Sequence, residues 1–166
     1  MNYTIRSATA ADEPFLWQML YYAAHMDEDD AAAELARTNP DLRDYVAGWG
    51  ERAGDIGIIA LAADGGEVGA AWARVMPAQS SLYRFVARGT PEVAIAVAPD
   101  HLGAGVGTLL LRCLLEAASC SHPRLALSVR AGNPAMRLYE RLGFVTVGLI
   151  TNRVGGTSYV MEVVLA

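Results

Sequence analysis

Apolar residues recur along the chain at two spacings, which separate the expected strands from the expected helices. Continuous or alternating apolar runs predict strands. These are expected at residues 3–6, 56–62, 68–76, 92–98, 125–129, 144–150 and 157–165. Apolar positions three and four residues apart predict helices. These are expected after Thr9, near residues 31–37 and 42–48, from residue 106 to about 119, and at residues 135–142. This order of elements predicts an α/β fold, with a mixed sheet of about six to seven strands and helices on both faces.

Residues typical of turns and caps support these boundaries. Asp64 and Gly65 predict a hairpin between the expected strands at 56–62 and 68–76, because such pairs suit backbone with positive φ. Asn133 followed by Pro134 is typical of a helix start, and Gly143 of a helix end.

Three glycines, Gly103, Gly105 and Gly107, lie between the expected strand at 92–98 and the helix that follows. The expected buried face of that helix consists of Val106, Leu109, Leu110, Cys113, Leu114 and Ala117. Glycine lets a ligand approach backbone N–H groups closely, and a helix start presents unpaired N–H donors and a positive dipole end. The stretch therefore indicates a phosphate or pyrophosphate site, with a plain turn as the alternative. Its spacing is neither the dinucleotide fingerprint nor a P-loop.

Composition narrows the classes of protein that the chain can belong to. The chain has 166 residues, 53% of them hydrophobic, and we expect one domain over residues 1–166. A net charge of −5 argues against nucleic-acid binding. No apolar run approaches membrane-spanning length and the first residues do not resemble a secretion signal, so we expect a cytoplasmic protein with no membrane partner. The three histidines and two cysteines have no metal-ligand spacing, so no metal is expected.

A second stretch, one expected strand after the glycines, makes the pattern specific. Residues 133–144 read Asn-Pro-Ala-Met-Arg-Leu-Tyr-Glu-Arg-Leu-Gly-Phe. With the glycine stretch at residues 103–108, this resembles the GNAT superfamily of acyl-CoA-dependent N-acyltransferases. The first stretch is similar to the family's pyrophosphate motif and the second to its Leu-Tyr-Glu-Arg/Lys-Leu-Gly-Phe motif. The resemblance in order and spacing extends from Tyr3 to Leu165.

The resemblance implies that acetyl-CoA is the co-substrate and that it lies between two splayed strands. Its pantetheine arm is expected to pair with the strand around Ile95, Ala96 and Val97, much as a peptide adds to a sheet edge. Its pyrophosphate is expected on the glycine stretch. That stretch comprises Gly103, Ala104, Gly105, Val106, Gly107 and Thr108.

The sequence departs from the family pattern at two positions. Leu102 stands where the family usually has Gln or Arg. Because leucine has no polar side chain, backbone N–H groups are expected to make most of the contacts with the pyrophosphate. Asn133 lies six residues before Tyr139, where the commonest spacing is seven. The resemblance implies that Asn133 contacts the pantetheine arm, and the alternative is a helix N-cap alone.

The resemblance also implies the chemistry, which is attack of an amine on the thioester. Tyr139 stands at the position of the family's usual general acid for the departing thiolate, and the alternative is a core tyrosine. Glu92 is the candidate general base. It lies about 13 Å of strand from Ala96, so it would act through ordered water, and the alternative is a carboxylate at the start of a strand.

The acceptor is expected to be a small-molecule amine, bound by aromatic and acidic residues together. In the family, the acceptor site comprises the first two helices and the loop after the hairpin. These regions contribute Tyr21, Tyr22, His25, Asp27, Glu28, Asp29, Asp30, Trp72 and Tyr83. Aromatic rings beside carboxylates favour a cationic amine, although the acidic run is also typical of a solvated helix start. The alternatives are a protein N-terminal acetyltransferase and a catalytically silent acyl-CoA-binding regulatory module. Dimers are common in the family, which leaves a homodimer open.

Overall fold

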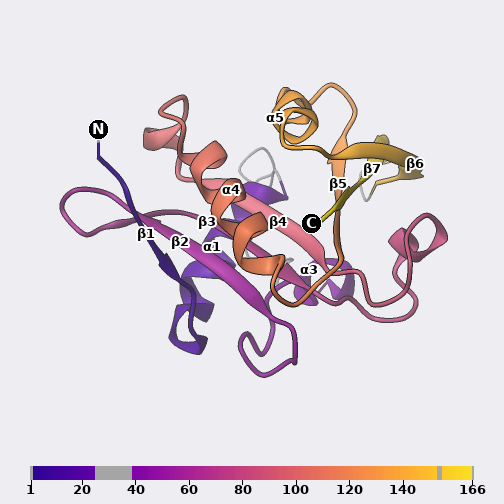
Figure 1. Ribbon diagram of the computed structural model, residues 1–166, viewed down its shortest axis with the longest axis horizontal. Coiled ribbons are helices and arrows are strands. Elements are labelled where there is room, and N and C mark those ends of the chain that lie inside the picture. Colours follow the sequence, from indigo (N-terminus) through magenta and orange to yellow (C-terminus); the bar gives the residue numbers. More distant parts are fainter. Residues whose placement is uncertain (1, 25–38, 153–154, 166) are drawn as a thin grey trace.

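The computed structural model describes residues 2–24, 39–152 and 155–165, and it contains a seven-stranded mixed sheet (Figure 1). The strands lie in the spatial order β1-β2-β3-β4-β5-β7-β6. Their bounds are β1 (Thr4–Ser7), β2 (Ile56–Leu61), β3 (Glu67–Arg74), β4 (Glu92–Val97), β5 (Arg124–Arg130), β6 (Val145–Thr151) and β7 (Thr157–Val164). Every neighbouring pair is antiparallel except β4 and β5, which are parallel. The predicted fold class is confirmed.

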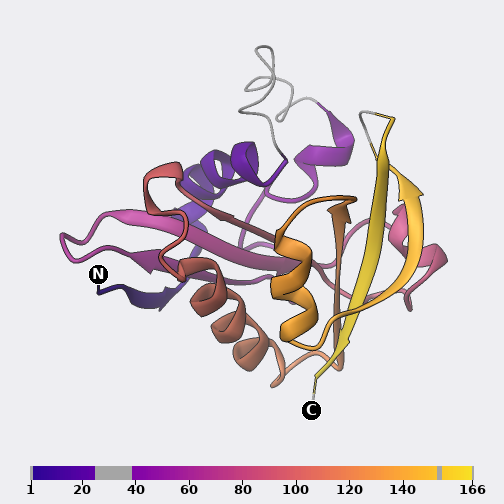
Figure 2. The same ribbon diagram turned by 90° about the horizontal axis from the view of Figure 1, so that it is seen from above.

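Helices cover both faces of this sheet (Figure 2). They are α1 (Glu13–Ala23), α3 (Pro40–Arg43), α4 (Val106–Ala118) and α5 (Ala135–Arg141), with 3-10 turns at Ala10–Asp12, Ser81–Arg84 and Pro99–His101. The face that carries α1 also packs against Val46 and Trp49, whereas α4 and α5 share the opposite face. None of the helices in the described ranges is long and apolar enough to cross a membrane.

The hairpin of β2 and β3 forms as predicted and gives the sheet its most deeply buried strand. Gly65 has φ +85°, and the Ala62 N–H donates to the Gly66 carbonyl over 2.8 Å. β3 is buried from Val68 to its end because both faces are covered. At Gly69 an added Cβ would lie 3.0 Å from Leu110 of α4, so the missing side chain lets the helix pack directly on the strand.

The predicted buried face of α4 is right at its centre and wrong at its edges. Val106, Leu110 and Leu114 are buried as expected. Leu111 and Ala118 are also buried, whereas Leu109, Cys113 and Ala117 are only half-buried. The residues that the sheet buries lie four apart, with Leu111 on one flank, so the buried face is rotated about the helix axis from the face that we expected.

The helix expected at residues 42–48 is shorter than predicted. α3 ends at Arg43, and the chain continues in turns through positive-φ glycines at Gly48 (+69°) and Gly50 (+88°). The carbonyls of Asp44 and Ala47 accept hydrogen bonds from the side chain of Arg74 instead of continuing the helix. The helix expected at 31–37, His25 and the acidic run at 27–30 lie outside the described residues.

Candidate functional site

β4 and β5 meet at a single pair of residues and then separate (Figure 2). Glu92 stands opposite Ala126, and the Ala126 N–H donates to the Pro91 carbonyl over 3.0 Å. Beyond this point β4 remains paired with β3, and β5 remains paired with β7 through Arg130. We call the gap between β4 and β5 beyond Glu92 and Ala126 the fork.

The backbone of β4 presents hydrogen-bonding groups to the fork. The Ala98 N–H donates to the Val68 carbonyl of β3 over 2.8 Å, and Ala96 stands opposite Ala70 in the same ladder. N–H and C=O groups alternate sides along a strand. The amides of Ile95 and Val97 therefore face the fork, whereas that of Ala96 faces β3. Buried strand amides without partners are costly, so the fork is suited to a ligand that supplies them.

The glycine loop, residues 103–108, lies where β4 leads into α4. Gly103 and Gly105 have φ of +77° and +83°, and a Cβ added to either would meet nothing within 4 Å. Leu109 is the first residue to donate along the helix, to the Gly105 carbonyl at 3.1 Å. The N–H groups of residues 106–108 thus have no partner within the helix, and they add to the positive end of its dipole.

A hollow of about 230 Å³ lies in front of these donors. Its lining consists of Val97, His101, Leu102, Gly103, Gly105, Val106, Gly107, Thr108 and Leu138. Leu102 is 67% exposed at its edge, and His101 is held by a 3.0 Å hydrogen bond between its Nδ1 and the Tyr3 hydroxyl. The end of β4, the glycine loop and α5 therefore share one open hollow, and the helix N-terminus beside it is of the kind that favours an anion.

α5 is held at its start by the predicted cap and carries Tyr139 on its inner face. The Asn133 Oδ1 accepts the Ala135 N–H at 2.9 Å, which confirms the N-cap. Tyr139 is buried, and its ring stands edge-on to Phe144 with centroids 6.0 Å apart. Burial raises the pKa of the Tyr139 hydroxyl to about 12. This side chain is protonated at neutral pH, as an ordinary tyrosine is, and its burial makes the hydroxyl a weaker acid.

Glu92 lies on the opposite face of the sheet from Tyr139. Its side chain is buried at the point where the fork begins, with the residue 3% exposed. The hydroxyl of Tyr45 donates a hydrogen bond to its Oε2. Burial raises the pKa of Glu92 to about 7, and the hydrogen bond from Tyr45 acts against that rise. A carboxyl with this pKa exchanges protons readily near neutral pH.

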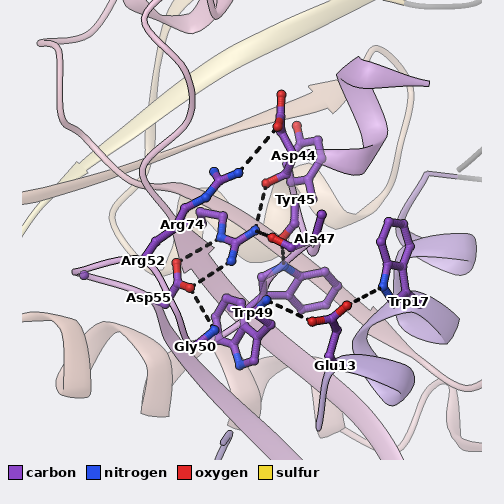
Figure 3. Close-up of polar contacts among 12 residues, drawn as sticks. Glu13, Trp17, Asp44, Tyr45, Ala47, Trp49, Gly50, Arg52, Asp55 and Arg74 are labelled. Atoms are coloured by element: carbon purple, nitrogen blue, oxygen red, sulfur yellow. Dashed lines mark hydrogen bonds and ion pairs between the residues drawn. The ribbon is translucent and has the colours of Figure 1, made fainter. Parts of the chain in front are cut away.

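Arg74 stands opposite Glu92 in the β3–β4 ladder but directs its charge elsewhere (Figure 3). Its Nε and Nη2 each donate to Asp55 at 2.9 Å, and both side chains of this pair are buried. Its Nη1 donates to two backbone carbonyls, and its guanidinium lies 5.4 Å from the Trp49 ring centre. Because Asp55 balances the charge of Arg74, no cation in the described part of the chain pairs with Glu92 to keep it ionised.

The structure brings most of the predicted site residues to the fork and its two faces. Val97 and the glycine loop line one hollow, and Ile95 precedes them on the same side of β4. Tyr139 and Glu92 flank it from opposite faces of the sheet. Trp72 does not line an acceptor site as we expected, because it is fully buried and donates its indole N–H to the Tyr45 carbonyl at 2.9 Å.

Sequence reasoning missed Tyr45 and the Arg74–Asp55 pair. A signal for the pair was present, since Arg74 ends an otherwise apolar strand and a charge there calls for a buried partner. Tyr45 has no such signal, because it lies in a turn and reaches Glu92 only through the fold.

Comparison with known proteins places this geometry in a family. The profile of the acetyltransferase (GNAT) domain matches residues 54–146. No curated protein is similar enough in sequence to count as a match.

Solved structures share the fold across nearly the whole chain. An acetyltransferase of the GNAT family from Streptococcus pneumoniae is 22% identical, with a TM-score of 0.72 over 99% of this chain and 100% of that one. A phosphinothricin acetyltransferase from Sinorhizobium meliloti, solved with acetyl-CoA, is 21% identical, with a TM-score of 0.65 over 100% and 90%. A spermidine/spermine N-acetyltransferase from Vibrio cholerae, solved with manganese ions, is 16% identical, with a TM-score of 0.64 over 98% and 92%. Within the described part of this chain, no three His, Cys, Asp or Glu side chains gather as a metal site would require.

Exchange of Glu92 for Gln should change how stability depends on pH. The pKa of Glu92 is about 7 in the folded state against an ordinary 4.5, so the folded protein keeps a proton that the unfolded chain has released. The wild type therefore loses stability as the pH rises through this window, by roughly 2.5 kcal/mol between pH 5 and pH 8. Urea unfolding should show Glu92→Gln gaining about that much relative to wild type over the same interval.

The matched control is Glu116→Gln on an exposed position of α4, which should leave the wild-type pH dependence in place. A difference between wild type and Glu92→Gln that is equal at pH 5 and pH 8 would contradict the assignment of a raised pKa to Glu92.

Proposed function

This chain belongs to the GNAT acetyltransferase family, and we propose that it transfers the acetyl group of acetyl-CoA to the nitrogen of a small cationic amine. The family match confirms the expected class of enzyme, an acyl-CoA-dependent N-acyltransferase. The observation that carries the proposal is the fork, which presents backbone donors and acceptors between a buried acid on one face and a buried carboxylate on the other.

The residues at the fork fit acetyl-CoA as the donor. The unpaired N–H groups at the start of α4 suit the pyrophosphate, and the open space at Gly103 and Gly105 leaves room for it. The amides of Ile95 and Val97 suit the amide groups of the pantetheine arm. The small side chain of Ala96 is buried in the cluster that β4 forms with α1. The exposed Leu102 adds no polar contact, so backbone groups carry most of the binding.

Acetyl-CoA supplies an activated thioester. Residues of the chain accept a proton on one side of it and donate a proton on the other. Glu92 takes the proton that the amine loses on attack, through ordered water, since a base with a pKa of about 7 suits this task. Tyr139 gives a proton to the thiolate that leaves. Its place on the face of α5, opposite Glu92, keeps the two proton transfers on separate sides of the sheet.

Three observations support a cationic amine as the acceptor. The chain carries a net charge of −5. The rings of Tyr21 and Tyr22 form an edge-on pair, with centroids 5.4 Å apart, on the helix that covers the face of Glu92. Ring faces attract ammonium groups. One of the similar structures is named for acetyl transfer to spermidine and spermine, which are amines of this kind.

Exchange of Gly105 for Glu should abolish CoA binding, because the added carboxylate would project into the pyrophosphate position. The matched control is Gly65→Glu in the β2–β3 turn. Both glycines have positive φ, +83° and +85°, and both have open space at Cβ, so the backbone cost is the same. Calorimetric titration with CoA should show loss of binding in the first variant only. Equal affinity in the two variants would rule out the glycine loop as the pyrophosphate site.

Exchange of Tyr139 for Phe should lower turnover about 10- to 100-fold while leaving CoA affinity nearly unchanged, because only proton donation is lost. The assay is thiol release from acetyl-CoA with a panel of polyamines, aminoglycosides, amino acids and peptide N-termini. Wild-type turnover in the variant would make Tyr139 a core residue.

In the same panel, reaction with peptide N-termini alone would identify an N-terminal acetyltransferase, and CoA binding without any thiol release would identify a silent binding module.

A further inference from the structure

The backbone around Tyr45 is fixed by side chains from the centre of the sheet (Figure 3). The indole N–H of Trp72 donates to the Tyr45 carbonyl at 2.9 Å. The Nη1 of Arg74 donates to the carbonyls of Asp44 and Ala47 at 3.2 and 2.7 Å. Three successive hydrogen bonds from β3 thus hold a stretch of turns that would otherwise be free to shift.

The same stretch is held from two further directions. The Oε1 of Glu13 on α1 accepts the Trp49 N–H at 3.1 Å. The carboxylate of Asp55 binds Arg74 through both oxygens and also accepts the Gly50 N–H at 3.0 Å. Because the Arg74–Asp55 pair is buried, moving either partner would leave a charge uncompensated, which makes the arrangement stiff.

The fixed turn delivers one polar side chain to Glu92. The hydroxyl of Tyr45 donates to the Glu92 carboxylate, and no other described side chain is hydrogen-bonded or ion-paired to that carboxylate. The charged groups around Glu92 are engaged elsewhere: Arg74 with Asp55, and Glu13 with the backbone of Trp49 and the indole of Trp17. Asp44 pairs outward with Arg52 at 3.5 Å.

We propose that Tyr45 is the positioning residue of the catalytic base, holding the Glu92 carboxylate toward the fork through its hydroxyl. This inference rests on the proposed function, because it takes Glu92 as the base. Tyr45 itself is half-buried, whereas the Glu92 residue to which its hydroxyl donates is 3% exposed. The Arg74–Asp55 pair and Trp72 serve catalysis through Tyr45, by fixing the backbone that carries it.

The physical consequence is a change in the protonation of Glu92 when the hydroxyl is removed. A hydrogen bond donated to a carboxylate stabilises its charged form, so its loss raises the pKa of Glu92 above its present value of about 7. We expect the rise to be about one pH unit, as for loss of a hydrogen bond to a charged group. At pH 7 the ionised fraction then falls about fivefold, and it recovers by about pH 9.

The test compares wild type with Tyr45→Phe, Ser119→Ala and Glu92→Gln. Ser119→Ala is the control, because its hydroxyl also donates one hydrogen bond, to the Glu116 carbonyl at 2.7 Å, but lies just after α4 and does not touch Glu92. The pH profile of kcat/KM is measured for acetyl-CoA with the best amine of the panel. In parallel, carbon-13 NMR of the labelled Glu92 carboxyl gives its pKa without any need for activity.

Tyr45→Phe should move the acid limb of the profile and the NMR titration of Glu92 upward together, by about one pH unit, with CoA affinity unchanged. Ser119→Ala should move neither. A Tyr45→Phe protein that loses activity equally at all pH values, or whose Glu92 titrates as in wild type, overturns the positioning role. If instead Glu92→Gln keeps the wild-type activity and acid limb, the base assignment in the proposed function has failed, whatever the Tyr45 variant does.

Discussion

The structure depends on a single parallel contact, between Glu92 of β4 and Ala126 of β5. Each strand is committed elsewhere, β4 to β3 and β5 to β7, so the twist of the sheet carries the two apart once that contact is passed. A sheet that opens in its middle would ordinarily leave backbone groups unpaired at high cost. Here the opening lies directly before a glycine loop and a helix start. We propose that together they bind an extended ligand with an anionic end, which would supply the missing partners.

A second constraint concerns charge on the face of α1. Two acids, Asp55 and Glu92, lie close to one buried arginine, Arg74. The guanidinium of Arg74 donates hydrogen bonds to both carboxylate oxygens of Asp55. Among the described side chains, Tyr45 alone is hydrogen-bonded to Glu92, and that bond only partly offsets burial, which raises the pKa of Glu92 to about 7. The arrangement destabilises the fold as the pH rises through 7, and under the proposed function it supplies a base matched to neutral pH, a trade typical of active sites.

Much of the fold could be predicted from the sequence because its signals are local. The strands, the β2–β3 turn, the Asn133 cap and the closing Gly143 depend on nearby residues and appear as expected. The glycine loop and the helix that begins at residue 106 were found for the same reason. What escaped prediction depends on contacts between distant segments: the shortened helix at α3, the burial of Trp72, and the approach of Tyr45 to Glu92, 47 residues further along the chain. No periodicity records such contacts, although the charge of Arg74 in an apolar strand pointed to one of them.

We propose that the pantetheine arm of acetyl-CoA pairs with β4 at the fork. Backbone amide exchange reports on this pairing at single residues. NMR hydrogen exchange of the protein saturated with CoA should show slowing of the Ile95 and Val97 amides by about tenfold or more, because the ligand becomes their hydrogen-bond partner. The amides of Ala94 and Ala96, which face β3 already, should exchange slowly with or without CoA. Unchanged exchange at Ile95 and Val97 in a fully saturated protein would show that the pantetheine arm does not pair with β4.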